Sequence, residues 1–242
     1  MNPKEPIWRG FHHGYQLPEN EVHVWRTTLD VAAPGVAKLQ SILSPNERKK
    51  ADLFCFERDR RRSVIGRSCL RLLLGQILRL PAGLLQFECD KFGKPSLSQE
   101  HRSLQFNLSH SGDLVLVAIA RDRAVGIDVE RIRTDMDVDD IAARFFSANE
   151  RRIVASVDGL ARYEAFFSCW TRKEAYLKAK GVGLATLDEE EPELLANQTR
   201  LTEGDWWKLR SLDVPHGYAA ALVAAIIFVI VMLGLGLMLL YW

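Results

Sequence analysis

The stretch VGIDVE at residues 125–130 is the part of the chain best suited to chemistry. On a β-strand its apolar residues would point to one face, and Asp128 and Glu130 would point to the other. Two neighbouring carboxylates repel each other and raise each other's pKa unless a cation lies between them. Magnesium suits such ligands, because it accepts one or two protein carboxylates together with water and substrate phosphate. The alternative is a half-buried strand with a hydrated polar face.

A third carboxylate, Glu174, falls on the apolar side of a helix predicted at residues 161–180. The apolar side chains of this helix form a stripe about 100° wide. Its members are Tyr163, Phe166, Phe167, Trp170 and Leu177. An unpaired carboxylate on the buried side is costly, so Glu174 needs a partner. Lys178, one turn further on, could form an ion pair with it. A magnesium ion shared with Asp128 and Glu130 is the other possibility.

The elements that must position these residues fall into two halves. Strands are predicted at 104–108, 114–120 and 124–130, and long helices at 61–80 and 160–180. The sequence SANER at 147–151 repeats SPNER at 44–48 at an offset of 103 residues, and each is typical of a helix-starting capping box. The predicted fold is therefore α+β, with two similar subdomains in a pseudo-twofold arrangement and a ligand cleft between them. The predicted domains are 1–112, 113–223 and an apolar tail at 224–242.

Five motifs occur in one order between residues 43 and 223. They are FGKP at 92–95, FNLSHSG at 106–112, GIDVE at 126–130, RFFS at 144–147 and WTRKEAYLK at 170–178. In this order they resemble the 4′-phosphopantetheinyl transferases of the larger, two-subdomain type. The resemblance implies magnesium-dependent transfer of 4′-phosphopantetheine from coenzyme A to a serine of an acyl or peptidyl carrier protein, with release of 3′,5′-ADP. The carrier would come from fatty acid, polyketide or nonribosomal peptide synthesis.

The resemblance also implies roles for individual residues. The residues that match the magnesium ligands are Asp128, Glu130 and Glu174. Glu150 matches the base for the carrier serine, and its place in a capping box is the structural alternative. Lys178 matches the residue that stabilises or protonates the leaving phosphate.

Contacts to the nucleotide and its phosphates are implied for a further set of residues. They are Arg48, Lys50, Arg62, Ser63, Lys94, Ser109 and His110. For the basic residues the alternative is a solvated surface, and for His110 it is a neutral ring in a turn. Glu47 departs from a position that is often basic in the family, which puts one phosphate contact in doubt.

The charge balance argues against nucleic acid as a partner. The chain has 32 basic and 31 acidic residues, and no aromatic residues are interleaved with the arginines at 58–62. A magnesium-dependent phosphodiesterase or nuclease is therefore disfavoured. Four cysteines without CxxC or zinc spacing, and an N-terminus without a secretory signal, favour a cytoplasmic protein. We expect a monomer. The alternative function is a membrane-tethered, non-catalytic module that binds coenzyme A or another anion.

The C-terminal tail carries 19 uncharged residues, 224–242. As a helix they would rise about 28 Å, close to the hydrocarbon thickness of a bilayer. The sequence therefore predicts a transmembrane helix that anchors the protein, with the catalytic domain in the cytosol. The nearby Lys208 and Arg210 lie on its N-terminal side, as the positive-inside rule expects. Packing of the tail on the domain, or an accident of the reading frame, are the alternatives.

Overall fold

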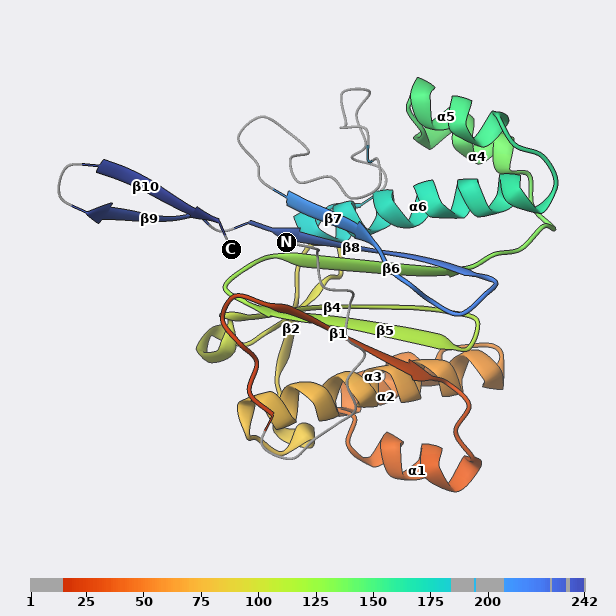
Figure 1. Ribbon diagram of the computed structural model, residues 1–242. Helices are drawn as coiled ribbons and strands as arrows, with labels where there is room; N and C mark the ends of the chain where they lie inside the picture. Colours follow the sequence, from red (N-terminus) through yellow and green to blue (C-terminus); the bar gives the residue numbers. More distant parts are fainter. Residues whose placement is uncertain (1–14, 184–193, 195–206, 227, 234–235, 242) are drawn as a thin grey trace.

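The computed structural model describes residues 15–183, 194, 207–226, 228–233 and 236–241. The prediction for the N-terminal 14 residues lies outside these residues. Two antiparallel sheets of three strands lie face to face in the middle of the protein, and helices cover their outer faces (Figure 1). The predicted α+β class is confirmed.

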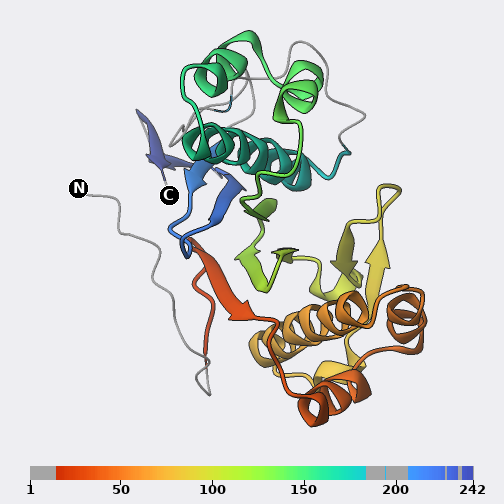
Figure 2. The same cartoon turned by 90° about the vertical axis from the view of Figure 1, so that its right-hand side faces the viewer.

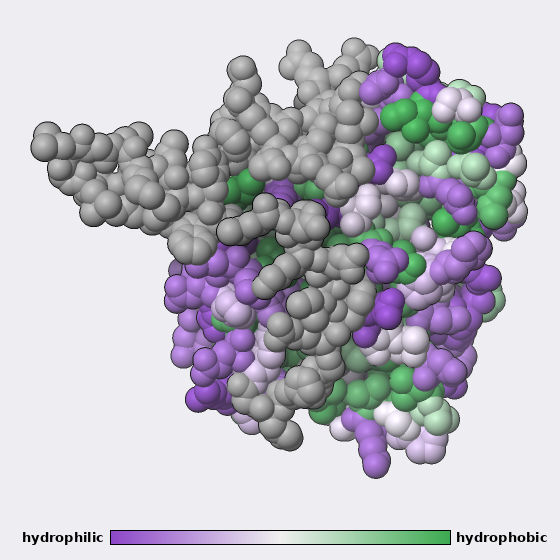
Figure 3. Space-filling model, viewed as in Figure 1, coloured by the Kyte–Doolittle hydropathy of each residue, from purple (hydrophilic) through white to green (hydrophobic). Residues whose placement is uncertain are grey.

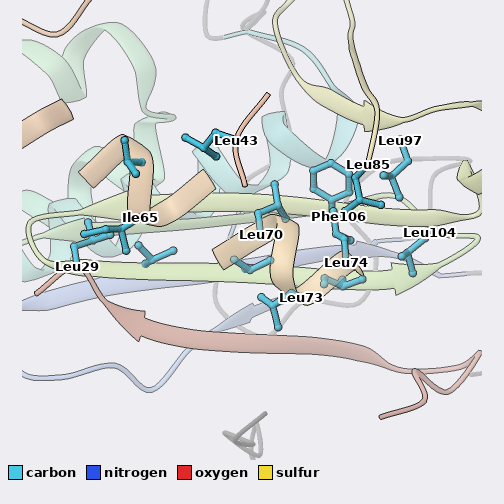
Figure 4. Packing of buried hydrophobic residues seen from close by; sticks show 14 of the residues in the cluster. Leu29, Leu43, Ile65, Leu70, Leu73, Leu74, Leu85, Leu97, Leu104 and Phe106 are labelled. Atoms are coloured by element: carbon cyan, nitrogen blue, oxygen red, sulfur yellow. The ribbon is translucent and has the colours of Figure 1, made fainter. Parts of the chain in front are cut away.

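The first sheet has the order β1-β5-β4 and carries the helices of the first half. Its strands are β1 (Val22–Thr28), β4 (Leu104–Ser111) and β5 (Leu114–Arg121). Its helices are α1 (Ala33–Ser41), α2 (Pro45–Asp52) and the long α3 (Glu57–Leu78). Leu70, Leu73 and Leu74 recur at helical spacing on α3 and are buried against the sheet (Figure 4), so the apolar stripe of α3 fixes this layer.

The second sheet has the order β6-β8-β7 and carries the helices of the second half. Its strands are β6 (Val125–Arg131), β7 (Trp207–Ser211) and β8 (Tyr218–Ala225). Its helices are α4 (Val138–Phe145), α5 (Ala148–Ala155) and the long α6 (Leu160–Lys180). Figure 2 shows these helices gathered on the side of the molecule opposite α1–α3. The two halves thus have the same plan, a long helix on a three-stranded sheet.

Strand β5 joins the two layers because it is buried on both faces. Val115, Val117 and Ile119 pack in the core under α3. The alternate residues, from Leu114 to Ala120, pack against Ile127 and its neighbours on the inner face of β6. An uninterrupted apolar strand is what burial on two faces requires.

Both predicted capping boxes are confirmed at the starts of the short helices. Ser44 caps α2 with Glu47, and Ser147 caps α5 with Glu150; in each, the serine side chain and the glutamate side chain bond reciprocally to backbone N–H groups. This arrangement satisfies donors that the first helical turn leaves without partners.

The remaining elements of the first half are short. They are the hairpin β2 (Phe87–Cys89) and β3 (Pro95–Leu97), and the 3₁₀ turns Ala82–Leu84 and Gln99–His101. The predicted boundary after residue 112 falls in the turn between β4 and β5, and β5 pairs with β1 and β4. The domain limits stay a prediction. On the face shown in Figure 3, hydrophilic residues surround small hydrophobic patches, one of them over α4 and α5.

The predicted C-terminal helix is wrong. The described tail residues form two antiparallel strands, β9 (Phe228–Leu233) and β10 (Gly236–Tyr241), which extend away from the second sheet (Figure 1). Positions 227, 234–235 and 242 lie outside the described residues. Five of the six residues at 226–231 are β-branched, and Gly234 and Gly236 follow, a composition that favours strands over a helix. Among the helices that the structure describes, none has the length and apolar character needed to cross a bilayer.

Candidate active site

The site forms where α6 crosses the polar face of β6. A Cβ atom on Gly126 would lie 2.0 Å from the carbonyl oxygen of Ala175 and 2.4 Å from the amide nitrogen of Ala179. Only glycine therefore permits this close approach of helix and strand. The approach brings Lys178 of α6 onto Asp128, two residues beyond Gly126 on the strand.

Asp128 is the most buried of the three predicted metal ligands, with 2% of its surface exposed. Its Oδ1 accepts hydrogen bonds from Lys178 Nζ at 2.6 Å and from Ser109 Oγ at 2.8 Å. Lys178 forms its ion pair with Asp128 rather than with Glu174, although the structure describes both carboxylates. Asp128 Oδ2 is buried without a hydrogen-bond partner among the described residues. A buried carboxylate oxygen in this state is suited to a cation.

Glu130 and Glu174 complete an acidic cluster with Asp128. Burial is the main cause that raises the pKa of Glu174; Lys178 lowers it, and the charges of Asp128 and Glu130 raise it further. Burial also raises the pKa of Glu130, with a hydrogen bond from Ser111 opposing the shift and Asp128 adding to it. The three carboxylates therefore act on one another electrostatically, as the metal-site prediction requires.

The chemistry of these carboxylates suits a magnesium ion, but the side chains are not arranged as a complete set of metal ligands. No group of three His, Cys, Asp or Glu side chains in the described part of the chain is arranged to hold a metal. The ammonium group of Lys178 supplies the positive charge next to Asp128. The assignment of Asp128, Glu130 and Glu174 as ligands stays a prediction, supported by the unpartnered Oδ2 and the oxygen-only donor set.

His110 connects this cluster to the first half. The residue is solvent-exposed at the end of β4, yet its pKa lies below the ordinary value, chiefly because the surrounding protein removes hydration, and also because of the charges of Lys178 and Arg62. Arg62 donates to Asp113 at 2.8 Å and lies 3.5 Å from Asp59. Arg62 of α3 and Lys178 of α6 thus both act on His110 electrostatically, and each of them is also paired with a carboxylate.

The other predicted nucleotide contacts lie on the first half. Arg48 and Ser63 are partly exposed, on α2 and α3, and Lys50 is exposed on α2. Ser109 is buried and is bonded to Asp128 and Lys178. These four positions stay predictions as coenzyme A contacts.

Lys94 has a structural role that the sequence did not indicate. Its ammonium group donates to the carbonyl oxygens of Lys178, of Ala179 at 3.4 Å and of Val125 at 3.3 Å. Burial lowers its pKa. The turn after β2 is thereby tied to the C-terminal end of α6, where a cation is favoured by the helix dipole. If Lys94 also contacts the nucleotide, as predicted, its ammonium group must make that contact as well as the bonds to these carbonyl oxygens.

Glu150, the predicted base, is fully buried. Its Oε2 accepts from the Ser147 amide at 2.8 Å and from Lys173 Nζ at 3.1 Å, and Lys173 is only 3% exposed. The first half has the same arrangement of a capping glutamate paired with a basic residue of the long helix: Glu47 caps α2 and pairs with Arg71 of α3 at 2.7 Å. The capping bond and the pairing with Arg71 explain why position 47 carries a glutamate, although this position is often basic in the family. The geometry favours the capping role of Glu150, and its role as a base stays a prediction.

Sequence reasoning missed Asn107, Ser111, Lys173 and Arg71. Ser111 donates to Glu130 Oε2 at 2.7 Å, and Asn107 accepts from the Ile127 amide at 2.8 Å. One signal was available, because polar residues alternate at 107, 109 and 111 on a predicted strand. The ion pairs of the two capping glutamates join residues more than twenty positions apart, and no local pattern marks such a pair.

The acidic cluster predicts a characteristic pH dependence of stability. The pKa of Glu174 is raised above its ordinary 4.5 in the folded state, so the folded protein holds this proton more tightly than the unfolded chain. The resulting stabilisation is present below pH about 4.5 and is lost as the pH rises through the raised pKa. With metal ions chelated, the free energy of unfolding should therefore fall over this window by more in the wild type than in Glu174→Gln.

Urea unfolding at a series of pH values measures this difference. Glu100→Gln, at an exposed position, is the matched control and should follow the wild-type curve. Identical pH dependence of the wild type and Glu174→Gln would contradict a raised pKa.

Comparison with known proteins agrees with this two-half architecture. The family model "4′-phosphopantetheinyl transferase, N-terminal" matches residues 32–122, and that of the "4′-phosphopantetheinyl transferase superfamily" matches residues 124–223. The two matches meet between β5 and β6. Together they describe an α+β protein of two subdomains with the acidic cluster on the second.

Several relatives align with residues of both halves. The 4′-phosphopantetheinyl transferase HetI of Nostoc sp. is 38% identical over 86% of this chain and 89% of its own length. The transferase gsp of Aneurinibacillus migulanus is 34% identical over 60% of this chain and 59% of its own, and Sfp of Bacillus subtilis is 30% identical over 61% and 64%. The chain therefore belongs to the 4′-phosphopantetheinyl transferase superfamily, in its larger two-subdomain type, and is a transferase.

Proposed function

We propose that this transferase moves 4′-phosphopantetheine from coenzyme A to a serine of an acyl or peptidyl carrier protein, releases 3′,5′-ADP and requires magnesium. The observation that carries the proposal is the close crossing of α6 over Gly126. It places Asp128, Glu130 and Glu174 within electrostatic range of one another and puts Lys178 beside them. The names of the relatives support the transferred group.

In the proposed reaction the serine Oγ bonds to the phosphorus that carries pantetheine, and the pyrophosphate bond to the nucleotide breaks. Asp128, Glu130 and Glu174 would hold magnesium, which when bound neutralises charge on the pyrophosphate and polarises the phosphorus. Lys178 would stabilise or protonate the leaving phosphate, because its ammonium group already lies in the site. Glu150 is the proposed base for the serine, with the capping role as its alternative.

The first half would bind the nucleotide end of coenzyme A. Arg48, Lys50, Arg62 and Ser63 are proposed for the 3′-phosphate and adenine, and Lys94, Ser109 and His110 for the nucleotide and phosphates. The support is that basic groups of both long helices, Arg62 of α3 and Lys178 of α6, act electrostatically on His110. Charge-assisted hydrogen bonds to phosphate are among the strong polar contacts in proteins.

Mass spectrometry of an apo carrier protein incubated with the enzyme, coenzyme A and magnesium tests the proposal. We expect the carrier to gain the mass of phosphopantetheine and 3′,5′-ADP to appear in equal amount. A chelator should stop the reaction, and added magnesium should restore it. Absence of transfer to fatty acid, polyketide and nonribosomal peptide carriers alike would overturn the proposal. The alternative, a membrane-tethered binding module, finds no support in the relatives.

The Arg62→Ala variant is expected to raise the KM for coenzyme A by about ten- to hundredfold, because a charge-assisted bond contributes roughly 1.5–3 kcal/mol. The KM for dephospho-coenzyme A, which lacks the 3′-phosphate, should change little. Arg58 lies on the same helix, and 72% of its side chain is exposed. The Arg58→Ala variant therefore serves as the control. Equal losses on both substrates would show that Arg62 acts elsewhere.

A further inference from the structure

Strands β4 and β6 lie side by side but belong to different sheets. In Figure 1 they form the facing layers where the two halves meet. A polar ladder of three side chains, Asn107, Ser109 and Ser111, bridges them. Asn107 Oδ1 accepts from the Ile127 amide at 2.8 Å, Ser109 Oγ from Val129 at 3.4 Å, and Ser111 Oγ from Arg131 at 3.0 Å. The constant offset of twenty residues shows that the strands run parallel.

In each of these three bonds a side-chain oxygen of β4 accepts from a backbone amide of β6, in place of the backbone carbonyl oxygen that a neighbouring strand of the same sheet would supply. The amide groups of β6 at 127, 129 and 131 would otherwise lack a partner at this edge of the sheet, at a cost in free energy. A side chain is longer than a backbone carbonyl, so the two strands are held in register at a wider separation than in a sheet.

The two serines differ from Asn107 in their second bond. A hydroxyl has one proton to donate beyond the bonds it accepts. Ser109 donates to Asp128 Oδ1 at 2.8 Å, and Ser111 donates to Glu130 Oε2 at 2.7 Å. Each serine therefore connects a fixed backbone amide of β6 to the carboxylate one residue earlier on the same strand. One oxygen of each carboxylate is held by a serine, and the other oxygen of Asp128, Oδ2, has no hydrogen-bond partner among the described residues.

We propose that Ser111 is a positioning residue of the transferase site: its hydroxyl, fixed by the Arg131 amide, orients the carboxylate of Glu130 for binding a divalent cation. The proposal rests on the proposed magnesium site and adds a residue to it. In this proposal Ser111 acts through Glu130 and not by direct contact with the substrate or the cation. Its role differs from that of Ser109, which also contacts Lys178.

The ladder provides a matched control. Asn107 is a rung of the same kind, but it contacts the Ile127 amide and neither carboxylate. If Ser111 mattered only for strand spacing, Ser111→Ala and Asn107→Ala would have the same consequences. If it orients Glu130, only Ser111→Ala should weaken cation binding. Ser111→Thr keeps the hydroxyl and suits a strand, so it should restore binding.

Calorimetric titration of the full chain with Mg²⁺ in the presence of coenzyme A measures the first consequence. Loss of a residue that orients a metal ligand typically weakens metal affinity by about 10- to 100-fold. We expect this loss for Ser111→Ala, near wild-type affinity for Ser111→Thr, and a change of less than about threefold for Asn107→Ala. Equal weakening by the two alanine variants, or no recovery with threonine, would overturn the proposal.

A double-mutant cycle in urea unfolding tests the Ser111–Glu130 contact without any metal. The shifts in unfolding midpoint for Ser111→Ala and Glu130→Ala should not add in the double variant, because each change removes the same hydrogen bond. Additive shifts would overturn the contact and the proposal with it. A wild-type chain that binds no Mg²⁺ while the cycle still shows coupling would overturn the proposed magnesium site and the positioning role, but it would uphold the hydrogen bond.

Discussion

Replacing Asp128 with asparagine is expected to lower the rate of phosphopantetheine transfer at least about a hundredfold, or roughly 3 kcal/mol in activation free energy. Asp128 is 2% exposed, its Oδ2 has no partner among the described residues, and Lys178 lies 2.6 Å from its Oδ1. The variant keeps the shape of the side chain and an acceptor for Ser109 but removes the negative charge. The loss should therefore fall on the chemical step more than on the fold.

The measurement is single-turnover transfer to an apo carrier protein, with thermal unfolding followed in parallel. Glu174→Ala should show a comparable loss, while Glu130→Gln should be milder, because water can replace one oxygen ligand of magnesium. Asp213→Asn, an exposed carboxylate before β8, is the control and should transfer at the wild-type rate. Transfer within about threefold of wild type for both Asp128→Asn and Glu174→Ala would contradict a shared site.

The parts of this site that lie on one element could be predicted from the sequence. The alternation of VGIDVE places both carboxylates on one face of β6, and the apolar stripe of α6 places Glu174 on the side that packs. The glycine between Val125 and Ile127 also leaves a backbone that a helix can approach. The pattern does not identify α6 as the helix that approaches this backbone, because the position of α6 depends on how its side chains pack with those of β7 and β8.

The parts that lie between elements could not be predicted, for a physical reason. The polar ladder needs β4 and β6 to run side by side in different sheets, and periodicity describes one strand at a time. Alternating polar residues at 107, 109 and 111 indicate a polar face but not what it meets. The partner of Lys178 shows the same limit, because its helical neighbour Glu174 was the local candidate and Asp128, fifty positions away, is the observed one.

The tail shows how a correct observation led to a wrong element. Length and lack of charge at 224–242 suit a membrane helix, and these properties are independent of secondary structure. An apolar run has no contrast between faces, so its periodicity cannot separate a helix from a strand. The β-branched residues at 226–231 and the glycines that follow carried the missing information.

Breaking the buried pair of Lys173 and Glu150 is expected to be strongly destabilising. The two side chains are 3% and 0% exposed, and their charged atoms lie 3.1 Å apart. Lys173→Met would leave the Glu150 carboxylate charged and buried without its partner, a situation that typically costs about 3–5 kcal/mol of folding free energy. Urea unfolding should show this loss, whereas Arg162→Met, which removes an exposed pair with Asp139, should leave the midpoint nearly unchanged.

The double variant Lys173→Met, Glu150→Gln separates the two roles of Glu150. Glutamine removes the stranded charge and can still accept from the Ser147 amide through its side-chain oxygen, as the capping box requires. We therefore expect the double variant to recover most of the stability lost by Lys173→Met. If Glu150 is chiefly a cap, Glu150→Gln should also transfer phosphopantetheine at a rate within about tenfold of wild type. A loss of about a hundredfold or more in stably folded Glu150→Gln would instead establish Glu150 as the base. If the double variant does not recover stability, the ion pair between Glu150 of α5 and Lys173 of α6 is not the cause of the loss in Lys173→Met.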